Sequence, residues 1–268
     1  MSVVVGAEEL PAPHRRARLR HLAPVVGIVP LAVALGAWQL LGSRDSVAFP
    51  VPSTWWHGVD RLRENGELFD SLRTTLYTFS VSLIVATVLG VLLGIVLGAS
   101  APVERAFTPL MDFFRTLPPP AVVPVAALIL GATVRASVAI VVFAIIWPIL
   151  LNTATAMREI PRVRLETAGA IGLSRFEAFY KVMLPSLAPA IMIGVRIALS
   201  ISLIVTLLVD IIGHGSGIGR VLYERQQRFD SEAVWGLLFI IGVLGFALNA
   251  ALVLMERRLP WTRQMRPS

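Results

Sequence analysis

The chain has no cysteine and few charged residues, and both shortages narrow what it can be. Without cysteine it forms no disulfide and offers no thiolate ligand to a metal ion. Only 15% of its 268 residues are charged, whereas 56% are apolar. Roughly a quarter of the residues are charged in a typical soluble domain. This composition excludes an ordinary soluble domain and indicates a chain that lies largely in a lipid bilayer.

Motifs that bind nucleotides or carry out hydrolysis are also missing. The sequence contains no H-E-x-x-H, no G-x-S-x-G and no G-x-x-x-x-G-K-[ST], and its four histidines are scattered among tail and loops. We therefore predict no catalytic residue, no metal and no cofactor in this chain. An intramembrane enzyme would need a nucleophile or a metal cluster within its spans, where this chain offers only Asp210, Arg196 and neutral hydroxyls.

Six segments are apolar and long enough to cross a membrane, which takes about 20 residues each. The fifth segment differs from the others because it carries Arg196 and Asp210. The first follows a basic stretch, as in a signal peptide, but it exceeds the usual length of a signal core and is predicted to be an uncleaved anchor. We predict an all-α integral membrane protein with six transmembrane helices. The predicted spans are 22–43, 74–103, 116–134, 136–157, 187–212 and 233–255.

The basic residues predict which ends of the helices face the cytoplasm, because Lys and Arg in short loops are retained there. With the N-terminus inside, fifteen of the 24 basic residues are cytoplasmic, eight are outside and Arg196 lies within a span. Both termini are therefore predicted to be cytoplasmic. The net charge of +7 then reflects topology, and nucleic-acid binding is not expected. This gives a basic tail at 1–21, a membrane domain at 22–256 with a cytoplasmic loop at 158–186, and a second tail at 257–268.

The cytoplasmic loop reads as two short helices folded against each other. Pro161 suits the first turn of one helix, predicted at 162–171, and Gly172 suits its end, where a left-handed residue is favoured. Ser174 and Glu177 have the S-x-x-E spacing of a capping box, so a second helix is predicted to start at once and to stop at Pro185. Such a rigid knob between two membrane helices is suited to fit the groove of a partner protein.

The same residues resemble the EAA motif of permease subunits in bacterial ATP-binding cassette importers, E-A-A-x-x-x-G followed nine residues later by I-x-L-P. Thr167 stands for the second alanine and Val182 for the isoleucine. The matching residues are Glu166, Ala168, Gly172, Leu184 and Pro185. In that family the loop docks into a cleft of the ATPase, so the resemblance implies that Glu166, Thr167, Ala168, Gly172, Leu184 and Pro185 couple this chain to an ATPase.

Four further stretches resemble the sulfonate, taurine and nitrate branch of these permeases. They are "FPVPS" after the first span, "LPPPAVVP" at 117–124, "WPILLNT" at 147–153 and "VDIIGHGSGIG" at 209–219. The resemblance implies the fold of a type I importer permease in the bacterial inner membrane, carrying a small anionic or polar solute. It also implies the partners: two copies of an ATPase that binds ATP and magnesium, a second copy of this permease, and an extracytoplasmic solute-binding protein.

Four residues are candidates for the pathway or its gate, each with a simpler alternative. Pro118 and Pro119 either touch the solute or stiffen the start of the third span. Asn152 either lines the pathway or packs beside the kinking Pro148. Asp210 is either functional or an interfacial carboxylate, since an ionisable residue in a span is costly.

A secondary transporter is the other transport class to weigh. It would be expected to show repeated halves and buried ionisable residues near the midplane of the membrane. The sequence shows neither a repeat nor such a pair.

Overall fold

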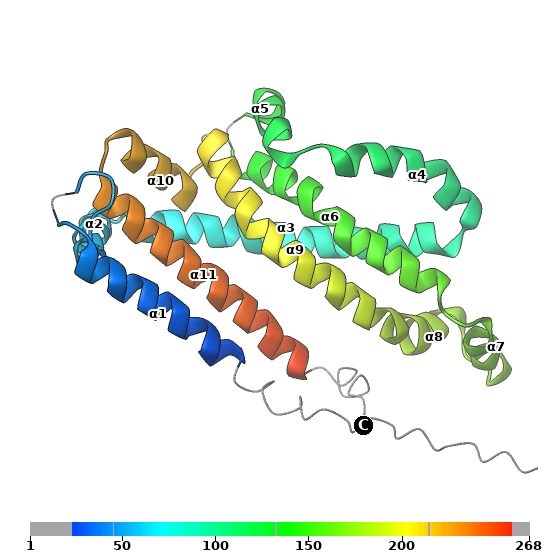
Figure 1. Cartoon of the computed structure of the whole chain (residues 1–268). Coiled ribbons are helices and arrows are strands. Elements are labelled where there is room, and N and C mark those ends of the chain that lie inside the picture. Colours follow the sequence, from blue (N-terminus) through cyan, green and yellow to red (C-terminus); the bar gives the residue numbers. More distant parts are fainter. Residues whose placement is uncertain (1–22, 45, 132, 214, 259–268) are drawn as a thin grey trace, which may run out of the picture. The chain divides into compact units, whose positions relative to one another are not determined.

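The computed structural model describes residues 23–44, 46–131, 133–213 and 215–258 (Figure 1). The predicted N-terminal tail, 1–21, and residues 259–268 of the predicted C-terminal tail lie outside these ranges. The chain divides into two units, 1–53 and 54–268, which are described separately.

The first unit holds α1 (Ala23–Leu41), at the place of the first predicted span. The chain after α1 folds back onto the end of this helix. The Ser53 N–H donates to Gln39 Oε1 at 2.9 Å, and the rings of Trp38 and Phe49 lie 6.3 Å apart. These contacts fix the start of α2 (Pro52–Glu64), which continues into the second unit.

The second unit is helical, with no strand among the residues that the structure describes. Four of its helices are long and apolar enough to cross a membrane, and the bent pair α4 and α5 makes five if it counts as one span. The apolar part of α1, Val29–Leu41, is shorter than these. The helices after α2 are α3 (Glu67–Ala99), α4 (Ala101–Thr116), α5 (Pro119–Leu130), α6 (Val134–Arg158), α7 (Arg162–Ala170), α8 (Arg175–Ala178), a π-helix (Phe179–Met183), α9 (Leu184–Ile212), α10 (Ile218–Gln227) and α11 (Ser231–Arg258).

Helix α6 forms the centre of the unit, between α3 and α9. Three glycines spaced four residues apart on α3, Gly90, Gly94 and Gly98, bring the two backbones close, as small residues do in membrane helix pairs. A Cβ at Gly94 would lie 2.7 Å from the Leu150 carbonyl oxygen on α6. Helix α9 approaches α6 in the same way, because a Cβ at Gly194 would lie 2.8 Å from the Ile149 Cα.

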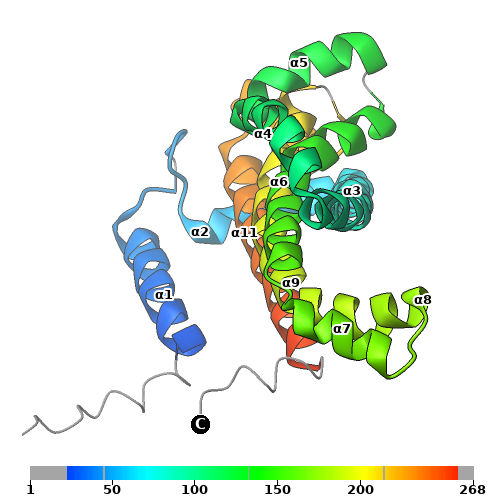
Figure 2. The same cartoon turned by 90° about the vertical axis from the view of Figure 1, so that its right-hand side faces the viewer.

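A second apolar core closes one end of the unit. It joins α2, the start of α3, α10 and the start of α11, and its fully buried members include Leu62, Ile218 and Leu237. Figure 1 places α10 at this end of the long helices and α7 and α8 at the other. Figure 2 shows α7 and α8 projecting together beyond the long helices.

The third span, predicted at 116–134, is part of a bent pair of helices, α4 and α5. The segment before it, expected as a loop, forms α4, and α4 and α5 are bent by 93° at a short break. The prolines explain the break, because Leu117 before Pro118 is held extended with ψ 120° and α5 begins at Pro119. Helix α4 was not predicted, because it is amphipathic and contains no long apolar run.

The prediction that a helix stops at Pro185 is wrong. Helix α8 continues through the π-helix into α9, so that residues 175–212 are one continuous helical segment. The Leu184 N–H bonds to the Phe179 carbonyl, five residues back. This wider turn comes just before Pro185, whose ring would otherwise press on the carbonyl of Lys181.

Candidate functional site

The knob, residues 162–184, has the turn that the sequence predicts. Helix α7 ends at Ala170, and Gly172, two residues later, has a φ of 78°, in the left-handed region. The Gly172 N–H donates to the Gly169 carbonyl and the Leu173 N–H to the Ala168 carbonyl, both at 3.0 Å. These are the two hydrogen bonds of a Schellman ending, in which glycine is the favoured residue.

The second half of the knob begins with the predicted capping box. The Glu177 N–H donates to Ser174 Oγ at 3.3 Å, and the Ser174 N–H donates to Glu177 Oε2 at 3.0 Å. Lys181 adds an ion pair to Glu177 at 2.9 Å, one turn later. Reciprocal caps satisfy the free N–H groups of a helix start, so the direction of the chain out of the turn is fixed.

The residues of the EAA-like motif divide between packing and exposure. Ala168 is buried, and the Thr167 hydroxyl donates to the Val163 carbonyl on its own helix. Glu166 is exposed, with no side-chain hydrogen bond or ion pair among the described residues. Leu184 is half-buried and Pro185 exposed, at the first turn of α9.

Sequence reasoning missed the apolar surface of the knob. Val163, Ile171, Phe176 and Tyr180 are 64–78% exposed, although α7 and α8 are too short to cross a membrane. Exposed apolar groups gathered on a small element mark an interaction surface. This surface could have been predicted from the sequence, because these apolar residues lie on predicted helices that are too short to cross a membrane.

At the far end of α9, Asp210 is buried and hydrogen-bonded within the protein. It is 3% exposed, so the surrounding protein covers the carboxylate. Thr75 on α3 donates its hydroxyl to Asp210 Oδ2 at 3.4 Å, and the Gly217 N–H donates to Asp210 Oδ1 at 3.3 Å. Thr75 also accepts the Ile218 N–H at 2.8 Å. The carboxylate therefore ties the start of α10 to α3 and α9.

The glycine-rich loop after α9 is shaped around this carboxylate. A Cβ at Gly215, Gly217 or Gly219 would collide with atoms of Asp210. The alternating glycines let the loop and α10 approach the side chain closely. One backbone amide of this loop, at Gly217, binds the chain's own Asp210.

The structure does not gather the other pathway candidates around Asp210. The Asn152 side chain donates to the Pro148 carbonyl at 2.7 Å, in the half of α6 nearer the knob. Pro118 and Pro119 form the bend between α4 and α5. Asn152 is half-buried and Pro119 begins a helix, so both contribute to local structure.

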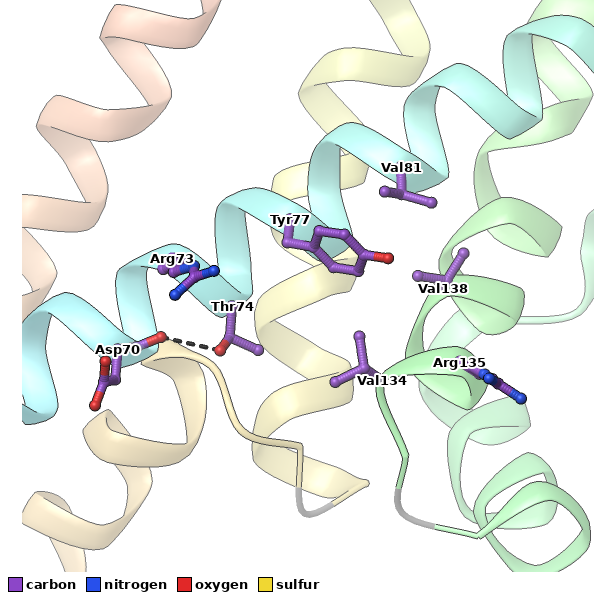
Figure 3. Close-up of a pocket in the computed structure, with 8 residues that line it drawn as sticks. All are labelled: Asp70, Arg73, Thr74, Tyr77, Val81, Val134, Arg135 and Val138. Carbon is purple, nitrogen blue, oxygen red and sulfur yellow. Dashed lines mark hydrogen bonds between the residues drawn. The ribbon is translucent and has the colours of Figure 1, made fainter.

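An open cleft of about 670 Å³ lies between the starts of α3 and α6 (Figure 3). Figure 3 shows Tyr77 reaching from α3 toward α6, with Val134 and Val138 on the opposite wall. Arg73 and Arg135 line the cleft, are exposed and have no ion-pair partner among the described residues, whereas Arg61 and Arg225 are paired. Sequence reasoning counted these arginines for topology only.

Comparison with known proteins adds a family match and relatives over most of the length. The model of the family described as "Binding-protein-dependent transport system inner membrane component" matches residues 86–260. The nitrate import permease protein NrtB of Leptolyngbya laminosa is 29% identical over 253 residues, covering 88% of this chain and 91% of the relative. The bicarbonate transport system permease protein CmpB of Synechocystis sp. is 27% identical over 265 residues, covering 94% of this chain and 93% of the relative.

A solved structure has the same fold. It is the MetNI methionine ABC transporter in an inward-facing conformation, with a TM-score of 0.63 at 20% identity. The match covers 73% of this chain and 97% of that one.

Proposed function

The chain belongs to the family of binding-protein-dependent transport system inner membrane components, and we propose that it forms half of a homodimeric, ATP-driven importer. In this proposal α1 supplies a sixth span and both termini are cytoplasmic. The distribution of basic residues supports the orientation, because fifteen of 24 fall on the side assigned to the cytoplasm. With this orientation we keep the domain limits proposed from the sequence, 22–256 for the membrane domain and 158–186 for the cytoplasmic loop.

The knob is the observation that carries the mechanism. Its turn is fixed by Gly172, its second helix is capped by Ser174 and Glu177, and it presents exposed apolar side chains beyond the ends of the long helices. We propose that it docks into a partner ATPase, with Glu166 exposed for a polar contact and Ala168 and Gly172 holding the shape. Leu184 and Pro185 join the knob to α9, and Thr167 stabilises α7.

ATP and magnesium belong to the partner ATPase in this proposal. The sequence has no phosphate-binding loop, and the described residues contain no group of three or more His, Cys, Asp or Glu side chains able to hold a metal ion. The chain itself would contribute the path across the membrane and the connection between that path and the ATPase. A solute-binding protein would deliver the solute from outside.

Two copies are proposed because cassette ATPases act in pairs, and each chain offers one knob. The sequence shows no internal repeat that would supply a second. A two-fold pair is the commonest symmetry of protein assemblies. Exposed apolar side chains on α4 and α5, among them Phe107, Phe113 and Leu128, provide surface for the partner copy.

The solute is proposed to be a small oxyanion. Nitrate and bicarbonate, which the names of two relatives give as their cargo, are both small oxyanions. Arg73 and Arg135 at the open cleft are suited to the same charge, because guanidinium groups donate several hydrogen bonds to oxyanions. We place the cleft at the outer mouth of the path.

The role of Asp210 follows from its contacts. It fixes the loop and α10 at the outer end of α9, so we propose that it shapes the outer gate without touching the solute. Asn152, Pro118 and Pro119 are proposed to act on the path through helix shape: Asn152 bonds to the Pro148 carbonyl within α6, and the two prolines set the α4–α5 bend.

The test is assembly. Two copies of the chain with different affinity tags are co-expressed with a cassette ATPase from the same genome and purified through one tag. The proposal expects the second tag and the ATPase in the product. Recovery of the ATPase without the second tag would refute the homodimer, and failure to recover any ATPase would favour the secondary transporter.

A further inference from the structure

The turn between α10 and α11 holds a bulky residue where glycine is favoured. Phe229 has a φ of 56°, and among the described residues no other non-glycine has a positive φ. The Phe229 N–H donates to the Gln226 carbonyl and the Asp230 N–H to the Arg225 carbonyl, both at 3.0 Å. Phe229 therefore occupies the left-handed position of a Schellman ending, which is disfavoured for a large side chain.

At the end of α7, the left-handed position of the same kind of helix ending is occupied by glycine. Gly172 ends α7 with the equivalent pair of hydrogen bonds and a φ of 78°. The geometry of the ending therefore does not call for phenylalanine. A strained residue that persists in a turn points to a role for its side chain.

The Phe229 side chain does not contribute to the core of the protein. It is 80% exposed, and the preceding residues Gln226, Gln227 and Arg228 are exposed and polar. The backbone around it is fixed, because Asp230 accepts the Ala233 N–H at the start of α11 and pairs with Arg61 at 2.8 Å. An aromatic ring is thus held out rigidly from a polar surrounding.

This arrangement matches the anchor of a protein interface, where a few aromatic residues inside a polar rim carry most of the binding energy. A rigid anchor also loses little conformational freedom on binding. An aromatic that sits among lipid headgroups needs no fixed backbone, and the polar run before Phe229 does not extend an apolar face toward lipid.

The position of the turn identifies the partner. Helix α10 and the start of α11 lie at the end of the long helices opposite the knob (Figure 1). If the knob faces the ATPase in the cytoplasm, the turn faces the outside. We propose that Phe229 is an anchor residue by which the solute-binding protein docks on this permease, an inference that rests on the proposed function.

The experiment uses the full complex of this chain and its ATPase in lipid nanodiscs, titrated with the solute-binding protein of the same system. The measurement is the concentration of binding protein that gives half-maximal stimulation of ATP hydrolysis. We expect Phe229→Ala and Phe229→Gly to raise it about tenfold or more, and Phe229→Tyr to leave it within about twofold, since aromatic anchors carry a large share of interface energy. Basal hydrolysis should not change in any variant.

Thermal melting separates docking from folding, because glycine relieves the left-handed backbone. Phe229→Gly should melt a few degrees above Phe229→Ala, about 2–4 °C for a gain of roughly 1 kcal/mol in a chain of this size. A variant that is more stable yet docks worse cannot be explained by misfolding. Phe69→Ala is the control, since Phe69 is 61% exposed in the first turn of α3 and has an ordinary helical backbone.

The outcomes are distinct. Half-saturation within about twofold of wild type for both Phe229→Gly and Phe229→Ala would overturn the proposal, as would an equal loss in Phe69→Ala. Effects that depend on the lipid composition of the nanodisc and not on binding protein would assign the ring to the membrane instead. No stimulation of the wild-type complex by the binding protein would refute the proposed function itself, and with it this inference.

Discussion

Thr75 and Asp210 are hydrogen-bonded to each other although 135 residues separate them in the sequence. The threonine hydroxyl donates to the carboxylate, and its oxygen accepts the Ile218 N–H at the first residue of α10. Both side chains are buried. One buried pair thus joins α3, α9 and α10.

This pair predicts coupled losses. Asp210→Ala leaves the Thr75 hydroxyl and the Gly217 N–H without their acceptor, which costs about 1–3 kcal/mol per unsatisfied buried group. Asp210→Asn keeps one oxygen as an acceptor but places an NH₂ group opposite one of the two donors. We therefore expect a smaller loss of stability than in Asp210→Ala. Both should lower uptake and the melting temperature of the purified permease.

A double-mutant cycle checks the assignment. Thr75→Val keeps the shape of the side chain and removes the hydroxyl. The loss of stability in the double variant Thr75→Val/Asp210→Ala should therefore be smaller than the sum of the losses in the two single variants. Full additivity would show that the two residues act independently. Wild-type uptake in Asp210→Ala would remove Asp210 from the proposed gate.

The glycines of α3 predict a second result. Gly94→Ala places a methyl group 2.7 Å from the Leu150 carbonyl oxygen and 2.7 Å from the Thr153 Cβ. Overpacking of this kind costs about 1–3 kcal/mol, so the purified protein should melt earlier. Gly242→Ala in α11 is the matched control, because no atom lies within 4 Å of the added methyl. Equal melting of the two variants would contradict the observed packing of α3 on α6.

Substitutions in the knob should uncouple hydrolysis from transport. Gly172→Val forces a β-branched residue into a left-handed turn, and Glu166→Ala removes an exposed group that has no internal side-chain partner among the described residues. Uptake should fall severalfold while membrane insertion persists. Gly172→Asn is the control, since asparagine tolerates this backbone. Normal uptake in Gly172→Val and Glu166→Ala at equal abundance would contradict the coupling role.

The arginines of the cleft should matter for the solute and not for the fold. Arg73→Gln and Arg135→Gln are expected to reduce uptake of the proposed oxyanion by about tenfold when combined, a change of roughly 1.4 kcal/mol in the barrier. Hydrolysis stimulated by the binding protein should continue. Arg63→Gln, a surface arginine paired with Asp60, serves as the control. Unchanged uptake in the double variant would remove the cleft from the path.

The sequence was sufficient where the structure depends on local physics. Hydropathy predicted a span at 136–157, and α6 runs from Val134 to Arg158. The Gly172 turn and the Ser174 capping box were predicted because helix caps depend on residues three to five positions apart. The start of α3 at Glu67 was missed, since a hydropathy window measures membrane thickness and not the hydrogen-bonded length of a helix.

The features that the sequence did not predict depend on contacts between helices, or on backbone geometry, that no local pattern specifies. The acceptor role of Asp210 needed the positions of α3 and α10, and the sequence offered only an unexplained carboxylate followed by alternating glycines. The strain at Phe229 was equally hidden, because nothing in the residue type foretells a left-handed backbone. The continuation of α8 into α9 depended on a π turn, which absorbs the proline and has no sequence signature of its own.

The uninterrupted helix from Arg175 to Ile212 has a mechanical consequence. It is 38 residues long, about 55 Å at 1.5 Å per residue, and it begins in the knob and ends two residues after Asp210. Its π-helix and its two prolines, Pro185 and Pro189, all lie in the part next to the knob, and residues 190–212 contain no further proline. A movement of the knob is therefore passed toward Asp210 through this stretch of regular α-helix. The helix therefore links the knob directly to the buried Thr75–Asp210 hydrogen bond, and any movement of its Asp210 end must strain or break that bond.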